Sequence, residues 1–196
     1  MNALALKKGA SSKSAYNLRD PHAERVERHI IAVLVDNESG VLARVIGLFS
    51  GRGFNIDSLT VAEVDHLGHL SRITVVTSGT PEVIEQIKAQ LGRLVPVVDV
   101  HDLTVEAPHV ERELALVKVR GTGADRVEAM RMGEVFRAHI VDTTLESFVF
   151  EITGAPDKID TFIELMRPLG LVNVARTGVA AITRGPGKLE RERGHG

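Results

Sequence analysis

Cysteine is absent from this chain of 196 residues, and its absence excludes several kinds of site at once. Without thiols the chain cannot form disulfides, use a thiolate nucleophile, or hold zinc or an iron-sulfur cluster through cysteine ligands. A chain without disulfides also fits a reducing compartment, so we expect a cytoplasmic protein.

Aromatic residues are scarce as well: they make up 4% of the chain, with no tryptophan and a single tyrosine. The sequence therefore predicts cores built from valine, isoleucine and leucine. Scarce rings argue against binding of single-stranded nucleic acid, which uses base stacking on exposed aromatic side chains. The formal net charge of -2 adds to that argument, because binding to phosphates needs a concentrated basic surface. We expect no nucleic-acid partner.

Long apolar runs are also missing, since none approaches the roughly 20 residues that a membrane-spanning helix needs. We expect no membrane partner. The N-terminal stretch MNALALKKGASSKSAYNLRD lacks the apolar core and cleavage site of a secretory signal. It is basic and contains serine, which leaves a transit-like role open beside that of a disordered lead-in. What is present is the balance of a globular protein, with 43% hydrophobic and 26% charged residues.

The hydrophobic pattern after residue 28 alternates between the periods of strands and helices. It predicts strand, helix, strand, strand, helix and strand in the ranges 29–35, 41–49, 54–64, 70–77, 83–91 and 95–100. A phase slip near Asp57 predicts a bulge in the second of these strands. This order is that of a ferredoxin-like βαββαβ unit.

The same order recurs in the second half of the chain. Helices are predicted at 124–137 and after Pro156, and strands at 114–119, 139–144, 148–153, 171–174 and 179–182. We therefore predict an α+β protein of two tandem ferredoxin-like domains, at 28–104 and 111–184, with a linker at 105–110. Residues 1–27 and 185–196 are polar or charged and are expected to form flexible tails.

A four-stranded sheet with two helices on one face leaves its other face and its edge strands uncovered. Such surfaces are commonly covered by a second copy or by another chain. Homodimerisation, or docking onto a partner, is therefore expected on physical grounds.

The most informative segment, DNESGVL at residues 36–42, stands where the first strand turns into the first helix. Gly40 lets a ligand approach the backbone, and unpaired N–H groups of a first helical turn attract a carboxylate. Asn37 offers an amide that can meet either charge of an amino-acid zwitterion. The alternative, which residue chemistry alone favours, is that asparagine, serine and glycine simply form a turn and a helix cap.

Three stretches read together resemble the small regulatory subunits of acetolactate (acetohydroxyacid) synthase: VLVDNESGVLARVIGLFSGRGFNIDSLTVAEV, LSRITVV and HVERELALVKV. The resemblance runs in order over residues 28–184, and the first stretch is specific to this family among proteins with an ACT domain. It implies that the first unit is an ACT domain and that the chain forms a homodimer. It also implies a large catalytic partner subunit and feedback inhibition by a branched-chain amino acid, usually valine.

The resemblance implies no catalytic residue, metal or cofactor in this chain, and assigns thiamine diphosphate, magnesium and FAD to the large subunit. The effector-binding residues that it implies are Asn37, Gly40, Val41, Leu42, Asn55 and Ile56. The turn with Asn37 and Gly40 of one subunit would face Asn55 and Ile56 of its dimer mate. The helix start would take the carboxylate, and Ile56 would line the apolar side of the pocket.

Two other functions stay open on the sequence. One is a stand-alone amino-acid-binding ACT module that regulates a different enzyme or a transcription factor, and the other is a small enzyme or metal sensor. The metal reading rests on His66 and His69, whose isolated spacing is more typical of a solvated loop. Glu111 and Glu113 fall at the apparent linker, with nothing in the sequence to raise a carboxyl pKa.

Overall fold

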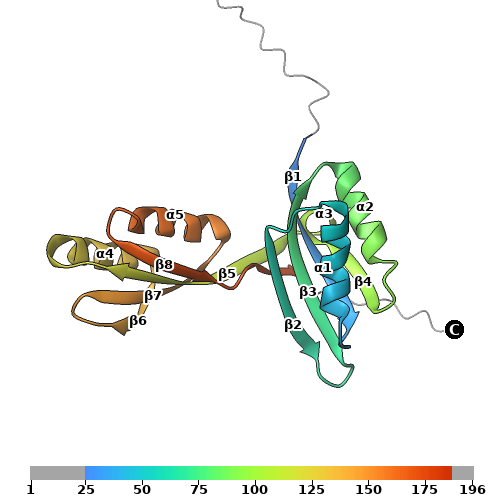
Figure 1. Ribbon diagram of the computed structural model, residues 1–196, viewed down its shortest axis with the longest axis horizontal. Coiled ribbons are helices and arrows are strands. Elements are labelled where there is room, and N and C mark those ends of the chain that lie inside the picture. The colour runs from blue at the N-terminus through green and yellow to red at the C-terminus, as the bar shows by residue number, and fades with distance from the viewer. Residues whose placement is uncertain (1–24, 187–196) are drawn as a thin grey trace, which may run out of the picture.

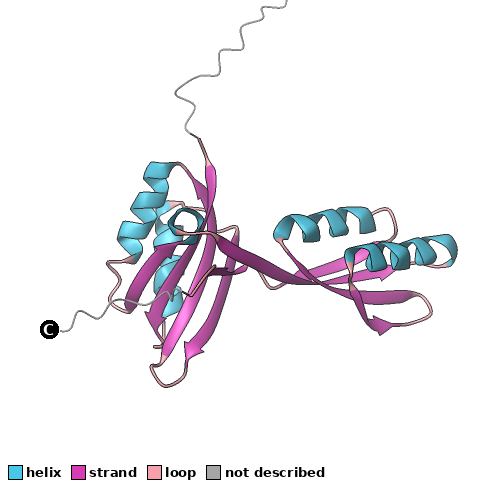
Figure 2. Ribbon diagram, turned by 180° about the vertical axis from the view of Figure 1, so that it is seen from behind, coloured by secondary structure: helices cyan, strands magenta, loops and turns pink. Residues whose placement is uncertain are grey.

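The computed structural model describes residues 25–186, which form two lobes (Figure 1). The tails predicted at 1–27 and 185–196 lie almost entirely outside these residues. Each lobe has an antiparallel sheet with helices on one face (Figure 2), so the predicted α+β fold of two ferredoxin-like units is confirmed. No helix in the described range is long and apolar enough to cross a membrane.

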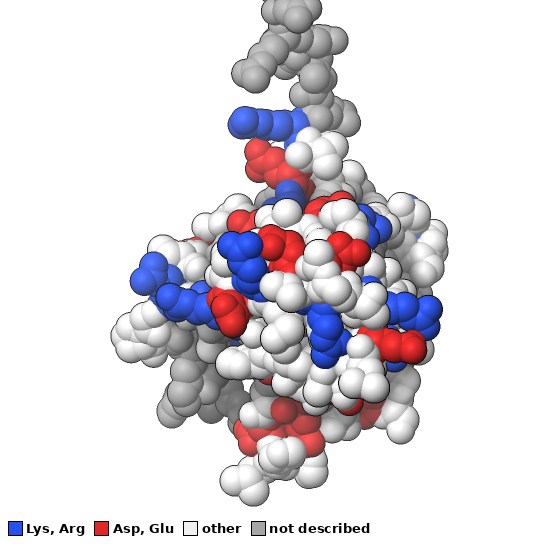
Figure 3. Space-filling model, turned by 90° about the vertical axis from the view of Figure 1, so that its left-hand side faces the viewer, with Lys and Arg blue, Asp and Glu red and all other residues white. Residues whose placement is uncertain are grey.

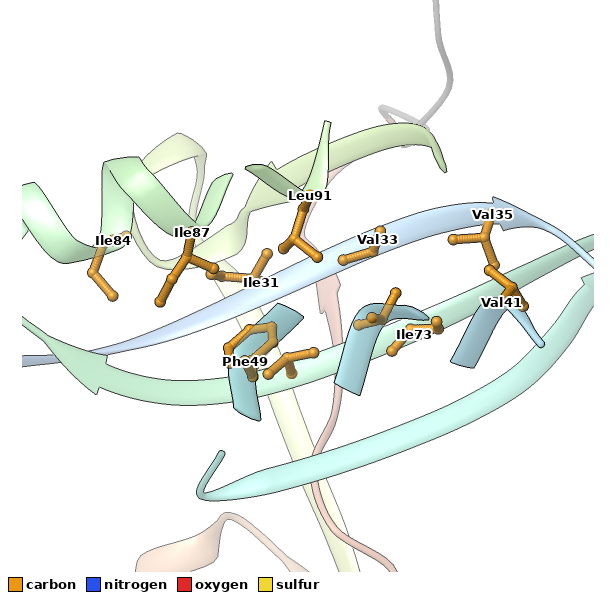
Figure 4. Packing of buried hydrophobic residues seen from close by; sticks show 11 residues of the cluster. Ile31, Val33, Val35, Val41, Phe49, Ile73, Ile84, Ile87 and Leu91 are labelled. Atoms are coloured by element: carbon orange, nitrogen blue, oxygen red, sulfur yellow. The ribbon is translucent and has the colours of Figure 1, made fainter. Parts of the chain in front are cut away.

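The first lobe contains a sheet in the order β2-β3-β1-β4. Its elements are β1 (Glu27–Asp36), α1 (Val41–Arg52), β2 (Ser58–Asp65), β3 (Leu70–Gly79), α2 (Pro81–Leu91) and β4 (Val97–Asp102). The central strand β1 is the apolar run predicted at 29–35. Its alternate side chains Ile31, Val33 and Val35 face the helices and are fully buried (Figure 4).

The core of the first lobe is aliphatic, as predicted, apart from one fully buried ring at Phe49. Helix α1 contributes Val41, Val45 and Phe49, which share one face because they recur every four residues. Helix α2 contributes three residues at similar spacing: Ile84, Ile87 and Leu91. Burying each of these side chains stabilises the fold by about 1.5–3 kcal/mol.

Strand β2 differs from its prediction. It begins at Ser58 rather than at residue 54, and its pairing with β3 becomes irregular only beyond Glu63. The bulge predicted near Asp57 is therefore wrong. Phe54 and Ile56 are apolar because they pack onto the core from a loop, and their spacing imitates the alternation of a strand.

The second lobe contains a sheet in the order β6-β7-β5-β8. Its elements are β5 (His109–Arg120), α4 (Gly123–Phe136), β6 (His139–Thr143), β7 (Ser147–Gly154), α5 (Pro156–Met166) and β8 (Leu171–Arg176). Four of the six phenylalanines lie here, at 136, 148, 150 and 162, so this core is not the purely aliphatic one predicted. Neighbouring ring centroids lie between 5.2 and 5.6 Å apart.

Strand β5 runs from one lobe into the other (Figure 1). Its residues 113–120 pair with β7, whereas residues 109–112 pair with β9 (Ala180–Thr183). Together with the short helix α3 (Leu103–Glu106), β9 packs on the open face of the first sheet. The apolar cluster buried there consists of Ile30, Ala32, Val76, Leu103, Val179 and Ala181. The last predicted strand thus packs on the first lobe, while the domain boundaries drawn from the sequence stay a prediction.

The face of the molecule at the end of the second lobe carries charges of both signs (Figure 3). Lysine and arginine side chains are interspersed there with aspartate and glutamate. This face therefore lacks the continuous basic surface that binding to a phosphate backbone needs.

Candidate functional site

Backbone hydrogen bonds hold the predicted effector turn that precedes α1. The N–H of Asp36 donates to the Pro96 carbonyl at 2.8 Å, and the N–H of Asn37 donates to the His69 carbonyl at 2.7 Å. Glu38 N–H closes the turn on the Asp36 carbonyl at 2.8 Å. These bonds anchor the turn to two neighbouring loops and leave the Asn37 side chain exposed.

Helix α1 begins behind a glycine in the left-handed region. Gly40 has a φ of 86° and a ψ of -2°, a conformation that costs a residue with a Cβ about 1–2 kcal/mol. Gly40 is the N-cap and residues 39–40 form a turn, so the alternative of a turn and helix cap is realised through the glycine, with no side-chain capping bond in the described residues. The first turn keeps N–H groups that can meet a carboxylate.

An ion pair lies beside this helix start. Arg44 Nη1 is 2.7 Å from Glu38 Oε1, and both side chains are half exposed. The pair offsets the charge of the Glu38 carboxylate, which would otherwise repel an anionic ligand at the helix start.

The loop that supports the turn is itself organised by a carboxylate. Asp65 accepts hydrogen bonds from the N–H groups of Leu67 and Gly68, each at 3.0 Å. The bond from Gly68 is the main cause that lowers the pKa of the Asp65 carboxyl below its ordinary value. The ionised Asp65 therefore shapes the loop whose His69 carbonyl holds Asn37.

The second half of the predicted site, Asn55 and Ile56, follows the end of α1. Gly53 ends that helix with a φ of 71°. The Asn55 carbonyl accepts a hydrogen bond from Thr77 Oγ1 at 2.6 Å, and its side-chain amide donates to the Asp57 carboxylate. Asn55 is exposed, whereas Ile56 is half-buried against the core. This segment thus offers one polar and one apolar group.

The two halves of the predicted site lie at opposite ends of α1. A helix of 12 residues is about 18 Å long, so Gly40 and Asn55 of one chain cannot touch the same small ligand. Leu42 is half-buried and Val41 is buried in the core, so at this helix start they offer a ligand backbone rather than side chain. The contact of Gly40 with Asn55 across two copies stays a prediction.

His66, one of the two histidines that the sequence offered as a weak metal site, lies beside a carboxylate. His66 Nδ1 lies 2.8 Å from Glu63 Oε2 in an exposed pair. Even so, the described part of the chain contains no group of three or more His, Cys, Asp or Glu residues that could hold a metal ion.

Glu113 is not the solvated linker residue that the sequence suggested. It is only 5% exposed, and its carboxylate accepts two bonds from Arg176, each 2.6 Å long. Arg176 also reaches Asp160 of α5 at 2.6 Å. The hydrogen bonds to Glu113, and then the single bond to Asp160, raise the pKa of Arg176. Sequence reasoning missed this network because Glu113 and Arg176 are 63 positions apart.

Both halves of the chain match family descriptions. Residues 31–99 match the AHAS small subunit-like ACT domain, and residues 112–185 match the small subunit of acetolactate synthase. The two matches together span both lobes.

Individual relatives agree with these matches. The probable acetolactate synthase small subunit of Archaeoglobus fulgidus is 47% identical over 158 residues, which cover 81% of this chain and 98% of the relative. The isozyme 3 small subunit of Escherichia coli is 46% identical over 159 residues, covering 81% and 96%. Among solved structures, the acetolactate synthase small subunit from Thermotoga maritima superimposes with a TM-score of 0.74 at 40% identity, covering 82% of this chain and 99% of that one.

Proposed function

Since this chain belongs to the family of acetolactate synthase small subunits, we propose that it is the regulatory subunit of that enzyme. In this role it activates a catalytic large subunit and makes that subunit sensitive to feedback inhibition by a branched-chain amino acid, valine first. The proposal places the protein in the cytoplasm and in valine, leucine and isoleucine biosynthesis.

The observation that carries the proposal is the start of α1. A left-handed glycine exposes the first helical turn, and no side-chain capping bond is present there in the described residues. Such a turn attracts the carboxylate of an amino acid, because its N–H groups and the helix dipole favour negative charge. The exposed Asn37 side chain beside it can accept a hydrogen bond from an ammonium group.

The apolar part of the effector requires a second surface. Ile56 is half-buried and adjoins the polar, exposed Asn55, so this segment suits the side chain of valine and its polar end together. Within one chain, Gly40 and Asn55 lie at opposite ends of α1. We therefore assign the two halves of the effector site to two copies in a homodimer.

In this proposal the chain acts by binding rather than by chemistry. A ligand between two copies favours one arrangement of the dimer by its differential affinity, and that arrangement changes what the dimer offers the large subunit. Thiamine diphosphate, magnesium and FAD belong to the large subunit. The described residues of this chain provide no cluster of three carboxylates or histidines for the metal.

Discrimination among branched-chain amino acids by such a pocket is modest. Valine, leucine and isoleucine differ by methylene groups, and one methylene in an apolar pocket is worth about 1–3 kcal/mol. We therefore expect graded inhibition by the three amino acids.

The match of residues 112–185 favours the regulatory subunit over a stand-alone ACT module, because an ACT module requires only the first lobe. The two functions also differ in partner, since a stand-alone module would leave the large subunit unaffected.

An activity titration tests the proposal. Purified large subunit is assayed for acetolactate formation with increasing amounts of this chain, with and without valine. We expect the rate to rise to a plateau and valine to lower that plateau. A rate that neither rises with this chain nor responds to valine would contradict the proposal.

A further inference from the structure

Two segments of chain connect the lobes, one on the way out and one on the way back. Residues 112–114 of β5 lead into the second lobe, and residues 176–179 return from it to β9. We call these two segments the neck. They are bonded to each other: Thr177 N–H donates to the Leu114 carbonyl at 3.0 Å, and Leu114 N–H donates to Thr177 Oγ1 at 3.2 Å. The neck is therefore a short two-stranded ribbon.

Strand β2 holds the returning segment through side-chain hydroxyls. Ser58 Oγ accepts a hydrogen bond from Val179 N–H at 2.8 Å, and Thr60 Oγ1 donates to the Val179 carbonyl at 3.0 Å. Val179 is only 3% exposed, and buried backbone groups require a partner. Both backbone polar groups of Val179 thus depend on β2.

Gly178 brings the returning segment close enough for these bonds. Its φ is 83°, and a Cβ at this position would lie 2.7 Å from Ser58 Oγ and 3.1 Å from Thr60 Cγ2. A side chain here would push the neck away from β2. The approach between the two segments is therefore close and specific to glycine.

The other end of the neck is bonded to the second lobe through Arg176. Arg176 forms its two bonds with the buried Glu113 of β5 and a third with Asp160 of α5, each 2.6 Å long. Paired bonds between a guanidinium and a carboxylate fix orientation as well as distance. A shift of the returning segment therefore carries α5 and the second sheet with it.

The start of β2 is also where the proposed effector contacts end. Only Asp57 separates Ile56 from Ser58, and Asp57 is itself held to β3 by its N–H bond to the Val76 carbonyl at 2.8 Å. Ser78 Oγ donates to the Asp57 carboxylate at 2.8 Å. Asp57 is thus fixed to β3 by its backbone and by its side chain, so Ile56 and Ser58 move together with this anchor rather than independently.

A cleft beside the neck leaves room for such a movement. It has a volume of about 430 Å³ and is lined by residues of both lobes, among them Asp57, Ser58, Pro156, Arg176 and Gly178. The lobes can thus change their relative position at this side without first displacing packed side chains.

We propose that Ser58 and Thr60 are positioning residues that transmit effector binding from the Asn55–Ile56 segment, through Val179 and the neck, to the second lobe. This inference rests on the proposed function and names its path of regulation. Binding of the amino acid favours one placement of the start of β2, and the two hydroxyl bonds impose the corresponding placement of the neck. Neither hydroxyl contacts the effector.

The test compares Ser58→Ala/Thr60→Val with wild type in the reconstituted holoenzyme. The matched control Ser50→Ala/Thr143→Val removes one serine and one threonine hydroxyl at exposed positions away from the neck, on α1 and β6. We expect the neck variant to bind valine by calorimetry within about twofold of wild type, as for sites that share no partner. Activation of the large subunit is expected to stay, while inhibition at saturating valine falls at least about fivefold, the lower range of allosteric coupling. The control should be inhibited like wild type.

Three results would overturn the inference. Full inhibition of the neck variant would show that the hydroxyls do not transmit binding. Loss of valine binding together with inhibition would place them in the pocket. A wild-type chain that neither binds valine nor confers inhibition would overturn the proposed function first.

A second measurement uses the wild-type holoenzyme and therefore does not require that a variant folds. Hydrogen exchange of the amides of residues 176–181 is followed with and without valine. We expect the exchange rates in this segment to change when valine binds, whereas those of β6, far from the neck, stay the same. Unchanged rates at 176–181 would overturn the inference.

Discussion

The two lobes share one order of strands and helices, yet the surroundings of their first helix starts differ. In the first lobe, α1 begins behind Gly40 with exposed turn residues around it. In the second lobe α4 also begins with a left-handed glycine, Gly123 with a φ of 59°, but a basic side chain near this start is bonded to the neighbouring hairpin. Arg126, in the first turn of α4, lies over the Phe148 ring at 4.5 Å and donates to the Leu145 carbonyl and Thr143 Oγ1. Equal topology therefore does not imply equal function, which depends on the residues at the site.

The lobes also differ in how their cores are filled. The first is packed with aliphatic side chains, and α1 and α2 have strongly apolar faces. The second uses interlocked phenylalanines, and α4 buries fully only Ala129 and Gly133. A core with a few large rings depends more on each of them than a core with many small groups does.

The largest expected effect tests this difference in packing. Phe150→Ala removes a ring that is 1% exposed and in contact with Phe148 and Phe162, so it should lower the free energy of unfolding of the second lobe by about 3–5 kcal/mol. Denaturant unfolding with hydrogen exchange resolved by lobe measures the change. The control Val127→Ala, at a 60% exposed position, should change little. An equal loss of protection in β1 would show that the lobes unfold as one unit.

Two glycine substitutions in equivalent helices should act with opposite sign. In α4 a Cβ on Gly133 would lie 2.6 Å from the Phe150 ring, so Gly133→Ala should destabilise by about 1–3 kcal/mol. In α1 nothing lies within 4 Å of a Cβ on Gly47, so Gly47→Ala should stabilise by about 0.5–1 kcal/mol. Thermal unfolding of both variants checks the pair. If both substitutions stabilised the protein, or both destabilised it, the two positions would not differ in packing as described.

The difference in ligand binding is tested at the two helix starts. In the proposed site, Asn37→Ala would remove one hydrogen bond to a charged effector, worth about 1.5–3 kcal/mol, so half-maximal inhibition should need at least about tenfold more valine. Activation of the large subunit should persist. Thr122→Ala, at the N-cap of α4, should leave the inhibition curve unchanged. Loss of activation and inhibition together after Asn37→Ala would show that the turn is structural.

The smallest expected effect concerns the loop that supports the turn. Hydrogen bonds from Gly68 and Leu67 lower the pKa of Asp65, so the carboxyl should titrate below its ordinary value of 3.8. A depressed folded-state pKa means that these bonds stabilise the loop above the ordinary pKa and are lost as the pH falls through the folded-state value. NMR titration of the Asp65 carboxyl measures the midpoint, and Asp65→Asn should abolish the pH dependence of the Gly68 amide shift. A midpoint at or above 3.8 would contradict the bonding.

Local patterns were sufficient for most elements of the fold. The run at 29–35 and the helical spacing of Val41, Val45 and Phe49 predicted β1 and α1 close to their observed bounds. Prediction failed where an apolar residue served another purpose, as at Phe54 and Ile56, which pack on the core from a loop. The spacing of apolar residues indicates which side chains are buried. It does not show whether a buried side chain belongs to a strand or to a loop.

The candidate site was predicted only in part. The glycine turn before α1 is a local feature, and the structure adds that Gly40 is left-handed and that no side-chain cap is present there in the described residues. The separation of Gly40 from Asn55 follows from the length of a helix that the sequence already predicted. The ion pair between the buried Glu113 and Arg176 could not be predicted from the sequence, because no local pattern links residues so far apart.

By itself the sequence determined two βαββαβ units, an aliphatic first core and a turn suited to an amino-acid carboxylate, because period, turn chemistry and helix capping are local properties. Only the tertiary structure decided that β9 leaves the second lobe for the first and that Ser58 and Thr60 hold its approach. These contacts join residues 119 and 121 positions apart. Contacts of that kind arise from the packing of whole elements, which short-range periodicity does not encode.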